Sequence, residues 1–183
     1  MLADKSNDSI SKADVFLGLG WLYSFYKRNN EALKYFDHSL KIRKNLVENN
    51  TLNIGYLVEN YFSIASHYRV NKKREKARTY LDSIKILKQQ NFIDEDFYSL
   101  SESGYLYAME GEYDKGLEQL QQSRAYFKSH NPSYLVVINA LLGNIYRKMG
   151  DLTKSETYLK ESLKISDLYS SHLDYKLFVY EEL

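Results

Sequence analysis

The chain has 183 residues, with 25 basic and 24 acidic side chains and a formal net charge of +1. A charge so close to zero argues against a dedicated nucleic-acid binder, which needs a basic face to neutralise phosphates. The chain has no cysteine, which excludes disulfides, thiolate zinc sites and cysteine nucleophiles. No apolar run approaches the roughly 20 residues that cross a bilayer, so no membrane insertion is expected. If the chain is complete, the absence of a signal-peptide core in the polar segment 1–12 predicts a cytoplasmic protein.

The order of helix-forming stretches and breaks predicts eight helices after that polar segment. Gly111 and Gly150, each followed by an acidic residue, are typical of a helix end and a new helix start. Residues 28–30 and 70–72 have the same role in the first half of the chain. Residues 171–183 are expected to form a capping helix or the beginning of a truncated fifth repeat. The expected helices span 12–27, 30–48, 54–70, 73–90, 95–110, 113–129, 133–149 and 152–170.

The same pattern of residues returns four times. Tyrosines at 23, 68, 107 and 146 are 45, 39 and 39 residues apart. A small residue stands three places before each tyrosine, a second small residue nine places after it, and a large apolar residue four places further on. Such spacing is typical of two packed antiparallel helices, in which small residues let the backbones approach. The three sets are Gly20, Ala65, Gly104 and Gly143; Ala32, Ala77, Gly116 and Ser155; and Phe36, Leu81, Leu120 and Leu159.

These residues resemble the tetratricopeptide repeat, whose signature is Trp…Leu-Gly…Tyr…Ala…Phe…Ala. The tryptophan position holds Phe16, Tyr61, Leu100 and Asn139, of which Asn139 departs from the pattern. The resemblance implies an all-α, right-handed solenoid of antiparallel helix pairs, with four repeats at about 13–53, 54–93, 94–132 and 133–170. The pitch is longer than that of the standard repeat. In this respect the chain resembles arrays in bacterial signalling and transcription-regulatory proteins.

The sequence contains no recognisable catalytic, metal-binding or cofactor-binding motif. We therefore expect no catalytic residue, no metal site, no cofactor and no enzyme activity. The histidines at 38, 67, 130 and 172 are scattered along the sequence. Residues 18–20 match only the first part of the glycine-rich motif that binds dinucleotides. The carboxylates at 94–96 suit a helix start. The basic run 72–78 is interpreted as a solvated turn, although phosphate, an acidic partner or an anionic membrane are alternatives.

By the same resemblance, the first helix of each pair lines a binding groove. Its residues are expected on the face that the packing positions leave open. Two of them, Trp21 and Phe25, have an alternative role in packing against a preceding repeat or domain. The predicted groove comprises Leu17, Trp21, Phe25, Phe62, Ser66, Arg69, Tyr98, Glu102, Tyr105, Met109, Asn144, Arg147 and Lys148.

The sequence therefore predicts a non-catalytic scaffold that binds a protein or peptide segment in its groove. The leading hypothesis is the sensory or interaction module of a bacterial signalling or regulatory protein. The alternatives are a stand-alone adaptor for complex assembly and an accessory domain of a larger enzyme. A homodimer formed through a terminal helix is left open.

Overall fold

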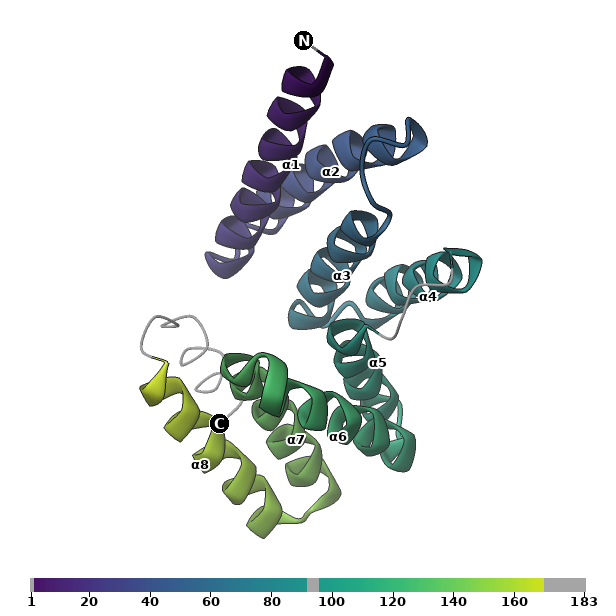
Figure 1. Ribbon diagram of the computed structural model, residues 1–183. Coiled ribbons are helices and arrows are strands. Elements are labelled where there is room, and N and C mark those ends of the chain that lie inside the picture. Colours follow the sequence, from purple (N-terminus) through teal and green to yellow (C-terminus); the bar gives the residue numbers. More distant parts are fainter. Residues whose placement is uncertain (1, 92–95, 170–183) are drawn as a thin grey trace. The chain divides into compact units, whose positions relative to one another are not determined.

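A computed structural model describes residues 2–91 and 96–169, and every regular element in these two ranges is helical (Figure 1). This confirms the all-α class, with helices joined in pairs by short turns. The helices are α1 (Leu2–Phe25), α2 (Asn29–Glu48), α3 (Gly55–Val70), α4 (Arg74–Asn91), α5 (Phe97–Met109), α6 (Tyr113–His130), a 3-10 turn η1 (Pro132–Tyr134), α7 (Leu135–Met149) and α8 (Leu152–Leu168).

The chain divides into two compact units, Met1–Asp94 and Glu95–Leu183, called unit 1 and unit 2 below. In unit 1, α1 packs on α2 and α3 packs on α4; in unit 2, the pairs are α5 with α6 and α7 with α8. Each unit thus holds two of the four expected repeats. The sequence predicted one array, and its right-handed superhelix stays a prediction.

The small residues of the repeat lie where the two helices of a pair cross. A Cβ on Gly116 would lie 2.6 Å from the carbonyl oxygen of Gly104, so α5 and α6 meet backbone to backbone. At Gly20, a Cβ would lie 2.4 Å from the ring of Phe36, which is fully buried. Because these contacts leave no room for a side chain, the repeat pattern is a packing pattern, as its spacing predicted.

The turn after each first helix contains a residue in the left-handed conformation, four places after the repeat tyrosine. This residue is Gly111 in α5–α6 and Gly150 in α7–α8, with φ of 96° and 84°. In the first two repeats it is Lys27 and Lys72, with φ of 57° and 58°. The predicted breaks are therefore confirmed. Two of them use a residue type for which this conformation is costly.

The helix ends follow the prediction to within three residues, except at the N-terminus. Helix α1 begins at Leu2 rather than at 12, because residues 2–12 contain neither glycine nor proline to stop it. Residues 2–12 of the polar segment are thus an extension of the first helix. The predicted helix at 171–183 and residues Asp94 and Glu95 lie outside the described residues. No helix in the described ranges is long and apolar enough to cross a membrane.

Candidate functional site

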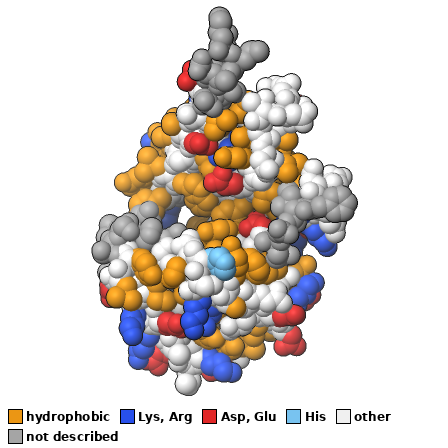
Figure 2. Space-filling view, viewed as in Figure 1, with side chains coloured by type: hydrophobic (Ala, Val, Ile, Leu, Met, Phe, Trp, Pro, Cys, Tyr) orange, Lys and Arg blue, Asp and Glu red, His pale blue; other side chains and the backbone are white. Residues whose placement is uncertain are grey.

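The α1 and α3 helices of unit 1 carry three of the predicted groove residues as an aromatic surface, consisting of Trp21, Phe25 and Phe62. The ring centroids of Trp21 and Phe62 lie 6.4 Å apart, so one predicted contact across two first helices is present. Trp21 also meets the buried Phe36 edge-on at 5.6 Å, which anchors one side of its ring. Trp21 and Phe25 nevertheless remain 37% and 39% exposed. Figure 2 shows hydrophobic side chains at the surface of unit 1 in broad patches.

The remaining predicted groove residues of unit 1 are buried. Leu17 is 6% exposed, Ser66 5% and Arg69 8%. Side chains this enclosed can support a neighbouring surface but offer little area to a ligand. Helical periodicity had placed them on one face with the aromatic residues, and it could not show how deeply the adjoining helices cover that face.

In unit 2, two of the predicted groove residues are packing tyrosines. The Tyr98 hydroxyl accepts a hydrogen bond from Asn131 Nδ2 at 2.9 Å, and its ring lies 4.7 Å from that of Tyr134. The Tyr105 hydroxyl lies 3.3 Å from Asn144 Oδ1, to which it donates, so this pair ties α5 to α7. Both tyrosines pack against the apolar core of unit 2. Their first role is thus to hold helices together.

The other predicted groove residues of unit 2 differ in how deeply they are buried. Glu102 and Asn144 are buried, at 1% and 4% exposure, and Met109 is partly buried. Arg147 and Lys148 are exposed in the last turn of α7, where cations suit the helix dipole. The structure thus assembles the aromatic surface of unit 1 and, separately, a cationic helix end in unit 2.

Sequence reasoning missed an aromatic stack that links the two helices of a repeat. Tyr23 stacks on Tyr35 with centroids 5.2 Å apart, and Tyr146 on Tyr158 at 5.5 Å. In the second repeat, Tyr68 stacks on Tyr80 with centroids 5.8 Å apart. The signal was present, since tyrosines at 35, 80 and 158 each follow the repeat tyrosine by 12 residues. A cation lies over every repeat tyrosine, at 3.6–5.5 Å from the ring centroid: Arg28, Lys76, Lys115 and Lys154.

Polar clamps join successive helix pairs within each unit. Arg43 of α2 is 2% exposed. Its guanidinium donates hydrogen bonds to the carboxylates of Asp14 at 2.7 Å and Glu59 at 2.8 Å and to the Asn60 oxygen at 3.0 Å. In unit 2, Arg124 Nε donates to Asn139 Oδ1 at 2.9 Å. Asn139, which departs from the repeat signature, thus serves as a buried hydrogen-bond acceptor.

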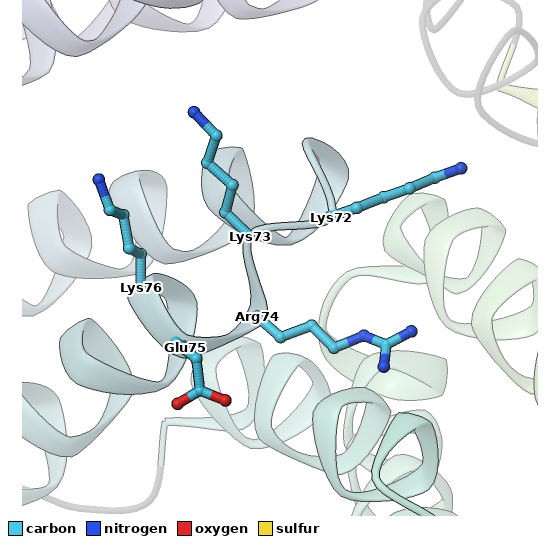
Figure 3. Close-up of a pocket in the computed structure, with 5 residues that line it drawn as sticks. All are labelled: Lys72, Lys73, Arg74, Glu75 and Lys76. Atoms are coloured by element: carbon cyan, nitrogen blue, oxygen red, sulfur yellow. The ribbon is translucent and has the colours of Figure 1, made fainter.

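The basic run 72–78 begins in the exposed turn between α3 and α4 and continues into the first residues of α4. Lys72, Lys73, Arg74, Glu75 and Lys76 line a shallow open hollow there (Figure 3). Lys73 and Lys76 extend to the same side, whereas Glu75 points away from both. Neither Lys72 nor Lys73 has an ion-pair partner in the part of the chain that the structure describes. The predicted solvated turn is confirmed for Lys72 and Lys73, whereas residues 74–78 are helical and Ala77 is buried.

The histidine and carboxylate side chains of the described ranges do not gather into a metal site. Within them, no three histidine or carboxylate side chains lie close enough together to hold a metal ion. Asp96 has the structural role expected of a helix start, because its carboxylate accepts a hydrogen bond from the Tyr98 backbone nitrogen at 3.1 Å.

Paired helices that cross at small residues define a helical-repeat protein. The family model for the tetratricopeptide repeat matches residues 13–46 and 137–167, which are the first repeat and most of the fourth. These two segments are therefore tetratricopeptide repeats, as their spacing predicted, a repeat type that is typical of protein-interaction scaffolds.

Among solved structures, the chain is similar to BtubC (BKLC) from P. vanneervenii. The TM-score is 0.58 and the sequence identity is 19%, with 86% of this chain covered. The match spans 64% of the BtubC chain, less than two thirds of its length. At this identity the likeness concerns the fold alone. No curated protein matches the sequence.

Proposed function

We propose that the chain is a non-catalytic scaffold that captures an apolar segment of another protein on the aromatic surface of unit 1. The observation that supports this proposal is the exposure of Trp21 and Phe25, at 37% and 39%, on a helix anchored by buried packing. Large aromatic side chains lose little conformational entropy when they bind and are the usual anchors of protein interfaces. A rigid helical support lowers the ordering cost further.

A place for the protein in bacterial signalling or transcription regulation belongs to the same proposal. Its support is the repeat pitch of 39–45 residues, which resembles the long-pitch arrays of such proteins.

The test begins with random peptides displayed on phage, selected for binding to the full chain. Affinities of the enriched peptides, carrying a fluorescent label, are then compared by anisotropy for the wild type, Trp21→Ala and Phe25→Ala. Each substitution removes an anchor, and about tenfold weaker binding is expected from either one. Ile86→Ala is the matched control, because Ile86 is an apolar side chain of α4 that is 52% exposed.

Trp21 is the single tryptophan of the chain, so its fluorescence reports directly on this surface. A bound apolar peptide is expected to shift its emission to shorter wavelength and to protect it from acrylamide quenching. Peptides that bind the two anchor variants and the control equally, without changing the Trp21 emission, would refute the proposed site.

A further inference from the structure

Two basic turns lie at the same end of unit 1. Helices α1 and α3 run in the same direction, so their C-terminal ends and the turns that follow them lie together (Figure 1). The first turn carries Lys27 and Arg28, and the second carries Lys72 and Lys73. These four exposed residues are called the basic edge below.

Contacts between the helix ends hold the two turns close to each other. Ser24, three residues before Lys27, belongs to α1, and its Oγ lies 2.7 Å from His67 Nδ1 of α3. The Asn71 side chain donates to the His67 carbonyl oxygen at 2.8 Å and so secures the second turn to the same helix end. Lys73 is close enough to contribute to lowering the pKa of His67, after the larger effect of burial. Residues 45 positions apart in sequence thus form one edge.

The basic edge has an excess of positive charge. Arg28 is paired with Glu31, and the carboxylate of Glu75 points away from Lys73 (Figure 3). Lys72 and Lys73 have no ion-pair partner in the described ranges. The formal charge of the whole chain is only +1, so this concentration is local. Lys72 and Lys73, which lie next to each other in the second turn, therefore attract an anionic group.

The basic edge adjoins the aromatic surface. Phe25 stands two residues before Lys27, and Trp21 one helical turn before Phe25. A partner segment that places an apolar side chain on Trp21 and Phe25 would therefore extend over Lys27 and the neighbouring turn. We propose that the basic edge selects partner peptides in which acidic residues flank the apolar anchor. The inference rests on the proposed function and names the partner of the same site.

The small size of the cluster favours a peptide over an extended anionic surface. A nucleic acid or a membrane engages many cations spread over a face. Here acidic residues interrupt the basic ones, with Glu31 and Glu75 beside the two turns. A small group of cations next to an aromatic anchor instead matches a short segment with a few carboxylates.

The experiment uses the enriched peptides from the phage selection and the full chain. The lysine variant is Lys72→Gln with Lys73→Gln, and its matched control is Lys160→Gln with Lys164→Gln, which removes the same charge from exposed positions of α8. Affinities are measured at low salt and at about 0.3 M NaCl, where the screening length is only about 6 Å. Circular dichroism melts verify that each variant folds.

The expected result is that enriched peptides carry Asp or Glu beside the apolar anchor. The lysine variant should bind them about fivefold more weakly at low salt, with the difference greatly reduced in high salt. Amide versions of the peptides, with Asn and Gln for Asp and Glu, should bind the wild type and the lysine variant alike. The control should bind as the wild type does.

Two results would overturn the inference and leave the proposed function standing. In the first, the peptides depend on Trp21 but bind the lysine variant as tightly as the wild type. In the second, phosphatidylserine vesicles or duplex DNA bind more tightly than any peptide, and this binding depends on Lys72 and Lys73. Binding that depends on neither Trp21 nor the lysines would overturn both proposals.

Discussion

The rings of Tyr146 and Tyr158 lie parallel, with 3° between their planes and 5.5 Å between their centroids. The first tyrosine belongs to α7 and the second to α8, so the stack joins the two helices of one repeat. Lys154 lies 5.1 Å from the ring centroid of Tyr146, and Arg124 lies 5.6 Å from that of Tyr158. Cations on the rings strengthen the stack beyond its buried area.

Replacing Tyr158 by leucine should therefore destabilise unit 2 by about 1–2 kcal/mol, because the stack, the cation contact and a hydrogen bond are all lost. Tyr158→Phe keeps the ring and loses only the 2.8 Å hydrogen bond from Gln121 Nε2, so it should cost about 1 kcal/mol or less. Urea unfolding followed by circular dichroism measures both. Equal loss for the two variants would show that the ring stack contributes nothing.

Two glycines of α1 form a matched pair for testing close packing. Gly20→Ala places a methyl group 2.4 Å from the Phe36 ring and should cost about 1–3 kcal/mol. At Gly18 no heavy atom lies within 4 Å of the added Cβ, so Gly18→Ala should stabilise the helix by up to about 1 kcal/mol. Thermal melts of both variants decide the matter. A destabilising Gly18→Ala would mean that this face of α1 is packed against something.

The left-handed turn residues allow a test in opposite directions. Lys27, with φ of 57°, should gain stability when replaced by glycine, by about 1 kcal/mol. Gly150→Ala should lose a similar amount, although nothing lies within 4 Å of its Cβ position, since φ is 84° there. Denaturant midpoints give both changes. If Lys27→Gly lowered stability, the loss of side-chain contacts would outweigh relief of backbone strain.

His67 should make unit 1 sensitive to mild acid. Burial, followed by the charge of Lys73, lowers its pKa below the ordinary 6.5. The unfolded chain then binds more protons than the folded chain between the two pKa values. The stability that depends on neutral His67 is therefore fully present above about pH 6.5. It decreases as the pH falls from there toward the pKa of His67 in the folded chain.

Nuclear magnetic resonance of the imidazole should show His67 titrating below 6.5, and Lys73→Gln should raise its pKa. In urea unfolding, His67→Gln should flatten the pH dependence of the free energy of unfolding below about pH 7. His38→Gln is the control, because His38 is exposed. A His67 that titrates at or above its ordinary value would contradict this account.

The groove prediction shows what helical periodicity can predict about a binding surface and what it cannot. It placed Trp21 and Phe62 on facing first helices, and their rings do lie 6.4 Å apart. It also placed Ser66 and Asn144 in the groove, where they are 5% and 4% exposed. Periodicity assigns a residue to a face of its own helix, but the helices around it decide how much of that face reaches solvent.

The sequence by itself determined the local architecture. Small residues such as Gly20 and Ala32, spaced around a tyrosine, predicted the crossing helices and the turns at Gly111 and Gly150, because backbone approach and turn conformation depend on nearby residues. Only the tertiary structure decided which distant residues meet, including Ser24 with His67 and the clamp around Arg43. These contacts depend on how one helix pair rests on the next, and no spacing within a repeat specifies that arrangement.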